Sequence, residues 1–375
     1  MSSFLLYHRP MNAARNLALS ACVAMFGAGC AHLDAARLPA IAQALEAAVQ
    51  TRQMPGAVFW LERQGQVYQH AHGLLSYLPH APAVRADTLY DVASLTKVMA
   101  TAPSVLLLVE EGRIGLDAPL TDYFAGCQPG ITIAQLLTHT SGLPAGLPAN
   151  PDWSGPERAH QLACSRKPTH PPGTFFRYSD VNYILLGQLV ERVSGMPLQQ
   201  FAQERIFVPL GMRDTGYLPR ELARIAPTGT GPAGIVHDPS TRRMGGVGGA
   251  AGLFSSAADV ARFARMLLAG GQGVLSADSV RLLTTVQTPP GMAETRAMGM
   301  DIDSPFARPR GSLFPVGSFG HTGFTGCFLW IDPQSGSFYL LLSNRVYPDQ
   351  QSNILSLYSE LGTLAAQAVL RKEAP

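Results

Sequence analysis

The sequence predicts an α/β fold of the α+β kind: one antiparallel sheet, flanked by N- and C-terminal helices, with an inserted and mostly helical lobe. Segments with strand character lie near both ends of the 375-residue chain, and helical periodicity dominates its middle. Grouped strands and grouped helices favour an antiparallel sheet with helices packed against it. We expect residues 36–85 and 290–373 to form a sheet lobe and residues 86–289 a helical lobe.

The first elements of the chain are a helix and a hairpin. Leu38 to Gln53 has the apolar spacing of a helix. Ala57 to Leu61 and Gln66 to Ala71 have strand character, and Arg63-Gln64-Gly65 forms the turn between them. The apolar run from Val98 to Val109 then predicts a buried helix.

Capping patterns mark helix starts in the middle of the chain. Thr132-Ile133-Ala134-Gln135 has the form of a capping box, and its helix should stop near Gly142. Ser256-Ala257-Ala258-Asp259 is a similar start for a helix through Leu268. Pro144 to Pro172 is rich in proline and glycine, which predicts a long loop with a short helix inside.

Strand character returns after Ala297. Pro333-Gln334-Ser335-Gly336 is a hairpin turn between two of the strands. We expect four strands and a final amphipathic helix over Met298–Ile302, Ser318–Gly323, Thr325–Asp332, Ser337–Asn344 and Ile354–Arg371.

Composition and charge exclude several function classes. Hydrophobic residues make up 46% and charged residues 14%, which is typical of a globular protein. The formal charge is +2, and residues 1–29 hold two arginines and no acid, so the rest has 26 basic and 26 acidic side chains. A neutral chain without a Lys/Arg run has no general attraction for nucleic acid or anionic membrane.

Residues 1–29 are predicted to be an export signal. Two arginines precede Leu17–Gly29, an uncharged and mostly apolar stretch too short to span a bilayer. Gly27-Ala28-Gly29-Cys30 resembles a bacterial lipoprotein processing site with Cys30 as the lipidated residue, and cleavage near Ala31 is the alternative. We expect an exported protein, periplasmic or held at the cell envelope by a lipid anchor alone.

Cysteine and histidine spacing gives no metal site. Cys127, Cys164 and Cys327 form no CxxC pair, and no histidine cluster has zinc-ligand spacing, so we expect no metal and no cofactor. In an exported protein Cys127 and Cys164 could form a disulfide, but buried free thiols fit equally well.

Three short motifs carry chemistry. Ser94-Leu95-Thr96-Lys97 places a hydroxyl and an ammonium at positions i and i+3, where they share one helix face. Tyr178-Ser179-Asp180 precedes the apolar helical run Val181–Val193, and His321-Thr322-Gly323 ends one strand and precedes another. A serine activated by lysine and tyrosine, with backbone N–H groups at a strand edge, is a complete acyl-transfer site.

In this order the motifs resemble those of the serine β-lactamase and penicillin-binding-protein superfamily. Leu136–Pro144, Tyr178–Gly187 and Gly320–Gly326 resemble its class C-like branch, which includes esterases and peptidases. The matches run from about Leu38 to Asn344. The resemblance implies a β-lactamase/transpeptidase-like fold with the active site between the two lobes.

The resemblance also implies residue roles. Ser94 would attack an ester or amide carbonyl, while Lys97 and Tyr178 share the general-base and general-acid work. The N–H groups of Ser94 and Phe324 would form the oxyanion hole, and Gly323 would keep the strand edge open for substrate. The other residues expected to bind substrate are Asp180, His321 and Thr322.

Two departures from the usual motifs bear on the substrate. Asp180 stands where Asn is usual, and its carboxylate should raise the pKa of Lys97. His321 replaces the more familiar Lys, which removes a fixed positive charge for a substrate carboxylate. Both changes disfavour anionic β-lactams. Arg345 could hold such a carboxylate, although a solvated charge at a strand end is the commoner role.

The sequence therefore predicts an exported serine hydrolase that cleaves an ester or amide through an acyl-enzyme on Ser94. The alternatives are a peptidase or amidase acting on cell-wall muropeptides, a class C-like β-lactamase, and a slowly deacylating penicillin-binding sensor. His139 and His237 are interpreted as turn and loop residues. The glycine-rich segment 245–252 is expected to let backbone approach the cleft rather than to bind a nucleotide.

Overall fold

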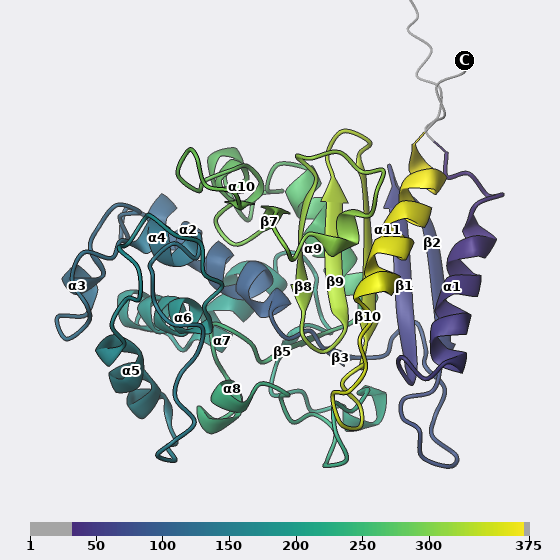
Figure 1. Ribbon diagram of the computed structural model, residues 1–375, viewed down its shortest axis with the longest axis horizontal. Helices are drawn as coiled ribbons and strands as arrows, with labels where there is room; N and C mark the ends of the chain where they lie inside the picture. The colour runs from purple at the N-terminus through teal and green to yellow at the C-terminus, as the bar shows by residue number, and fades with distance from the viewer. Residues whose placement is uncertain (1–31, 371–375) are drawn as a thin grey trace, which may run out of the picture. The chain divides into compact units, whose positions relative to one another are not determined.

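The computed structural model describes residues 32–370. A seven-stranded antiparallel sheet lies at the centre of this part of the chain (Figure 1). Its order is β2-β1-β10-β9-β8-β7-β6. β1 pairs with β10 so that Ala57 lies opposite Ser343, and the two ends of the chain thus complete one sheet, as predicted. The strands are β1 (Gly56–Arg63), β2 (Gln66–Gly73), β6 (Thr295–Arg296), β7 (Asp301–Asp303), β8 (Phe319–Gly323), β9 (Cys327–Asp332) and β10 (Ser337–Ser343).

Both faces of the central strands are buried, and alternate side chains serve different cores. In β9, Leu329 and Ile331 join the large core shared with the helical region. Phe328 and Trp330 point to the other face, where α1 (Leu38–Gln50) and α11 (Leu355–Val369) cover the sheet (Figure 1). The near-continuous apolar sequence of β9 and β10 follows from this double burial.

The helical region centres on α6 (Asp180–Ser194), whose apolar side chains are mostly buried. It packs against α2, α4, α5 and α7 and belongs to the same large core as the inner face of the sheet. The other α-helices of the described residues are α2 (Ala102–Glu110), α3 (Leu120–Tyr123), α4 (Ile133–Leu137), α5 (Pro156–Ser165), α7 (Leu198–Ala202), α8 (Pro239–Arg243), α9 (Ala257–Leu268) and α10 (Ala277–Thr284).

The predicted helix starts are confirmed, whereas the helix expected to stop near Gly142 already ends at Leu137. Thr132 and Gln135 form the capping box at the start of α4, with both reciprocal hydrogen bonds present. Ser256 caps α9 by accepting a hydrogen bond from the Asp259 N–H. The long loop contains α5 as its short helix.

Several strand predictions are wrong in detail. The strand expected from Met298 begins only at Asp301, because Ala297 N–H bonds to the Met300 carbonyl and Gly299 has a φ of 114°. The strand expected from Thr325 begins at Cys327 because residues 324–326 form a turn. A three-stranded sheet escaped prediction because its strands are too short for a period-2 pattern: β3 (Tyr90–Asp91), β5 (Leu253–Ser255) and β4 (Gly216–Tyr217).

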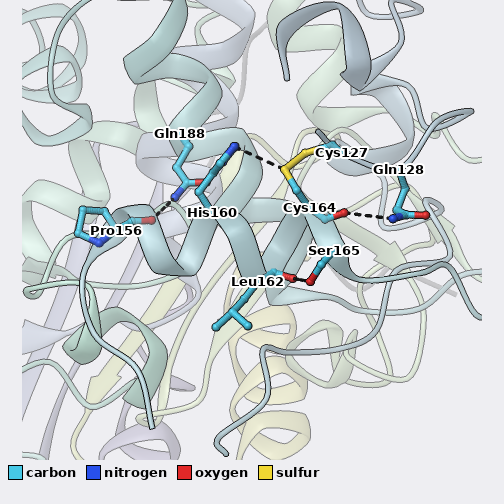
Figure 2. Close-up of a disulfide and its surroundings, with 8 residues drawn as sticks. All are labelled: Cys127, Gln128, Pro156, His160, Leu162, Cys164, Ser165 and Gln188. Atoms are coloured by element: carbon cyan, nitrogen blue, oxygen red, sulfur yellow. Dashed lines mark hydrogen bonds between the residues drawn. A yellow bond between two sulfur atoms is a disulfide. The ribbon is translucent and has the colours of Figure 1, made fainter. Parts of the chain in front are cut away.

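Cys127 and Cys164 form a disulfide, which decides between the two alternatives left by the sequence (Figure 2). It joins the turn after α3 to the end of α5. The His160 ring lies beside it, with Nε2 3.6 Å from the Cys164 sulfur. Closing a segment of 37 residues lowers the entropy of the unfolded chain and stabilises the fold by about 4 kcal/mol. Cys327 is a buried free thiol.

The predicted export signal, residues 1–29, and the lipidation residue Cys30 lie outside the described residues. Between residues 32 and 370, no helix combines the length and the apolar character needed to cross a membrane.

Candidate active site

Ser94 and Lys97 meet at the start of the helical region, as their spacing predicts. The Lys97 ammonium donates a hydrogen bond of 3.0 Å to Ser94 Oγ. Ser94 lies in the turn before the helix, and Lys97 begins a π-helical turn that continues into α2. Lys97 is fully buried, whereas Ser94 is partly accessible. The hydroxyl can therefore reach a substrate while its lysine partner is shielded from water.

The turn that presents Ser94 is fixed by Asp91, a residue that the sequence interpretation missed. Ala93 has a φ of 47°, which is unfavourable for a residue with a Cβ. The buried Asp91 carboxylate accepts the Ala93 N–H at 2.9 Å and the His237 N–H at 2.7 Å. Burial raises the pKa of Asp91 to about 6. Asp91 thus stabilises a strained backbone next to the candidate nucleophile.

Three oxygen atoms surround the Lys97 ammonium. Besides Ser94 Oγ, they are Asp180 Oδ1 at 2.7 Å and the Ala250 carbonyl at 2.8 Å. Burial by itself lowers the pKa of Lys97, but the Asp180 carboxylate and the Tyr178 phenol outweigh it, so the pKa is raised. Asp180 raises the pKa of Lys97, as predicted from the sequence, and Lys97 is held as an ammonium.

Tyr178 lies over Lys97 and is supported from behind by His139. The Lys97 nitrogen is 5.1 Å from the centroid of the Tyr178 ring, and the His139 ring is 4.4 Å from that ring, centroid to centroid. His139 Nδ1 accepts the Ser179 N–H, which assigns the imidazole proton to Nε2. Burial holds the pKa of His139 well below its usual value. His139 is thus a neutral support for Tyr178, consistent with a structural role.

His321 is also neutral. It is buried in β8, and its Nδ1 lies 2.8 Å from the Thr322 carbonyl, to which it donates. Burial, followed by the charges of Arg296 and Lys97, holds the pKa of His321 well below its usual value. The predicted loss of a fixed positive charge at this position is confirmed.

Gly323 has a packing role in addition to the role expected from the sequence. A Cβ at this position would lie 2.5 Å from the Val92 carbonyl and 3.4 Å from the Ala93 Cβ. The glycine therefore lets β8 pack against the turn that presents Ser94. The expectation that Gly323 leaves room for substrate is a separate role and stays a prediction.

A buried cation that the sequence interpretation missed lies behind Tyr178. The Arg296 side chain is fully buried, and its guanidinium lies 5.8 Å from the centre of the Tyr178 ring. Arg296 donates to the Gly299 carbonyl at 2.9 Å and forms a 3.4 Å ion pair with Asp301. His321 is neutral, but the buried Arg296 places a positive charge behind the Tyr178 ring. An isolated arginine in a segment of strand character gave no signal of this role.

Phe324 extends the site beyond Ser94. Within residues 32–370, the N–H groups of Ser94 and Phe324 donate to no other group, as an oxyanion hole requires. The Phe324 side chain is 55% exposed, and the Arg345 guanidinium lies 4.6 Å above its ring. Arg345 also donates to the Ser352 carbonyl. The structure therefore brings Arg345 beside the candidate oxyanion segment.

The glycine-rich segment 245–252 approaches the site closely, as predicted. Thr101 Oγ1 donates to the Gly249 carbonyl at 2.7 Å, next to the bond from Lys97 to Ala250. A Cβ on Gly249 would lie 2.0 Å from the Tyr183 carbonyl, so only glycine permits this contact with α6.

Comparison with known proteins gives consistent matches. The Beta-lactamase family model matches residues 41–359. A relative from Escherichia coli O157:H7, provisionally named a D-alanyl-D-alanine carboxypeptidase, is 31% identical, and the alignment covers 71% of this chain and 72% of the relative.

Solved structures share the fold. A beta-lactamase/D-alanine carboxypeptidase from Pseudomonas syringae superposes with a TM-score of 0.73 at 20% identity, covering 90% of this chain and 100% of that one. EstCE1, described as a hydrolase with promiscuous acyltransferase activity, superposes with a TM-score of 0.71 at 21% identity, covering 88% of this chain and 98% of the other.

Proposed function

The chain belongs to the β-lactamase family of hydrolases, and from this we propose that it is a serine hydrolase working through an acyl-enzyme on Ser94. The observation that carries the proposal is the 3.0 Å hydrogen bond between Lys97 and Ser94, with Lys97 clamped by Asp180. A nucleophile, a proton-transfer partner and an orienting group in contact are the signature of an activated serine.

In the proposed reaction, Ser94 Oγ forms a bond to the substrate carbonyl carbon as its proton passes to the Lys97–Tyr178 pair. Because Lys97 is held as an ammonium in the resting site, we assign the reactive form to the enzyme in which Lys97 has lost one proton, so that its neutral amine accepts the proton from Ser94 while Tyr178 relays a proton toward the leaving group. The same pair returns a proton to the leaving alcohol or amine. Water then cleaves the acyl-enzyme by the reverse sequence. The N–H groups of Ser94 and Phe324 would stabilise the oxyanion, each by about 3–4 kcal/mol.

Peptides ending in a D-alanine carboxylate are our first substrate candidate. The E. coli relative is provisionally named for this activity. Arg345, above the Phe324 ring, offers a cation for the terminal carboxylate beside the candidate oxyanion segment. An export signal at residues 1–29, with or without a lipid on Cys30, would bring the enzyme to cell-wall peptides, and we include export in the proposal.

Esters with an apolar acyl group are the second candidate. The exposed rings of Phe324 and Phe306 flank the site, and Phe306 packs 5.1 Å from Tyr178. Such a surface favours a neutral, apolar substrate.

A substrate panel tests the proposal. We expect the purified protein to hydrolyse short-chain nitrophenyl esters or D-alanyl-D-alanine peptides and muropeptides much faster than the cephalosporin nitrocefin. Arg345→Gln should raise KM for carboxylate-terminated peptides about tenfold or more while leaving neutral esters within twofold, because only the former lose an ion pair. Arg308→Gln serves as the matched arginine control.

Intact-mass measurement over time completes this test. An acyl adduct that appears and decays during turnover supports the hydrolase. An adduct that persists for hours would instead identify a slowly deacylating sensor. Turnover of nitrocefin at the rate of the best ester or peptide would overturn the preference against β-lactams.

The pH dependence should respond to Asp180→Asn. The Asp180 carboxylate is one cause of the raised pKa of Lys97, while burial acts in the opposite direction. Removing the carboxylate therefore lowers that pKa, so a neutral Lys97 becomes available at lower pH. We expect the rising limb of kcat/KM against pH to move to lower pH by about one unit or more. The measurement is a pH–rate profile.

Asp278→Asn, at an exposed carboxylate on α10, is the matched control and should leave the profile unchanged. A rising limb of Asp180→Asn that stays in place, or moves to higher pH, would contradict the assignment of Lys97 and Asp180 to proton transfer.

A further inference from the structure

Two histidines and a glutamate gather on the outer face of the sheet, away from Ser94. His70 and His72 lie on β2, two positions apart, so their side chains share one face of the strand. Opposite them in the ladder stand Phe59 and Ala57, which belong to the core beneath α1. Glu46 lies on α1, which runs beside β2 (Figure 1). The three side chains therefore meet between the first helix and the edge strand.

The geometry of the cluster suits a metal ion. One ligand atom of each residue lies within 4.8 Å of the others. His70 Nε2 is 3.5 Å from Glu46 Oε1, and the two imidazole rings are nearly parallel, at 9°, with centroids 5.9 Å apart. Tetrahedral zinc with bonds of about 2.0–2.1 Å needs ligand atoms about 3.3 Å apart, a spacing that small rotamer changes would reach.

His70 supplies a second, independent observation. Its Nε2 is buried, and apart from the 3.5 Å ion-pair contact with Glu46 it has no polar partner and no hydrogen bond among residues 32–370. A buried, unsatisfied imidazole nitrogen costs free energy unless a ligand engages it. Because that nitrogen points toward Glu46, an ion between the three groups would satisfy it.

From this arrangement we propose a zinc site formed by Glu46, His70 and His72, with water completing the coordination. Two imidazoles and one carboxylate suit Zn²⁺ and are poor ligands for Mg²⁺ or Ca²⁺, which prefer oxygen. The site is separate from the candidate active site. Four inter-strand spacings, about 19 Å, lie between β2 and β8.

The bound ion would crosslink α1 to the sheet edge. α1 is otherwise held there by the apolar contacts of Ile41, Leu45 and Ala48. Zinc that binds only the folded chain stabilises it by mass action. At a free zinc concentration of 100 times Kd, we expect the Tm to rise by about 4 °C for a chain of this size.

The test is isothermal titration of the metal-free protein with ZnCl₂, using protein purified without a histidine tag. We expect saturable binding of one zinc per chain, a matching rise in Tm, and no response to MgCl₂. His70→Gln, His72→Gln and Glu46→Gln should each weaken binding tenfold or more. Their Tm values without metal report whether the fold is intact. His80→Gln, at an exposed histidine on a nearby loop, should bind zinc like the unmodified protein.

A second group of possible metal ligands provides a further control. Cys127, Cys164 and His160 also lie within ligand distance, but their sulfurs form the disulfide (Figure 2). His160→Gln should therefore leave zinc binding unchanged. Substituting Co²⁺ should give a visible spectrum without a sulfur-to-metal charge-transfer band. Absence of zinc binding, binding unchanged in all three ligand variants, or a sulfur band would each overturn the proposal.

Discussion

Ser94→Ala is expected to lower turnover of the best substrate by about 10⁴- to 10⁶-fold without changing the stability of the fold. Removal of a nucleophile whose proton partners remain in place typically has an effect of this size. Ser94 Oγ is the atom that accepts from Lys97, and alanine removes nothing else from the site. The residual rate would come from the oxyanion donors and substrate binding alone.

Steady-state kinetics and covalent labelling by a fluorophosphonate probe would check this prediction together. Ser94→Ala should lose both catalytic turnover and covalent labelling by the probe. Ser104→Ala is the matched control, because Ser104 is a buried serine on α2 whose hydroxyl, among the described residues, bonds only to the Ala100 carbonyl. It should keep activity within about threefold. Activity of Ser94→Ala within tenfold of the unmodified protein would refute the acyl-enzyme.

Arg296→Met is expected to destabilise the protein by about 3–5 kcal/mol. Arg296 and Asp301 are a buried ion pair, 0% and 1% exposed, and removal of one partner leaves the other charge uncompensated. The expected measurement is a lower urea midpoint at unchanged slope. The exposed variant Arg281→Met should change stability by less than about 1 kcal/mol.

The loss of stability in Arg296→Met should be larger at high pH than at low pH. Burial raises the pKa of Asp301, and Arg296 acts against that rise. Without Arg296 the pKa rises further, so Asp301 is protonated more readily in the folded state than in the unfolded chain. Protonation removes the uncompensated charge, and we therefore expect a larger loss of stability at pH 8 than at pH 5. An equal loss at both values would exclude the buried charge as its cause.

A double variant separates stability from activity. Arg296→Met with Asp301→Leu replaces the ion pair by apolar groups of similar size, a change that is often nearly neutral for stability. If the positive charge behind Tyr178 assists proton transfer, the double variant should have the urea midpoint of the unmodified protein. Its turnover of substrate should still be at least tenfold slower than that of the unmodified protein. Recovery of both would show that Arg296 is structural only.

The sequence determined what depends on local order along the chain. The Ser94–Lys97 contact follows from i, i+3 spacing, and the start of α4 follows from a capping box whose partners are three residues apart. The two-sided burial of β9 and β10 appears in the sequence as long apolar runs. The family resemblance rests on the same short ordered motifs.

Only the tertiary structure decided what depends on contacts between distant segments. Arg296 acquires its place because β6 brings it behind Tyr178, more than a hundred residues earlier in the chain. Gly323 is required by the Val92 carbonyl on another element, and Glu46 meets His70 only when α1 packs on β2. A single arginine, glycine or glutamate carries no periodicity or spacing of its own. Its role is set by which partner the fold places within a few ångströms, and that information lies in the packing of the whole chain.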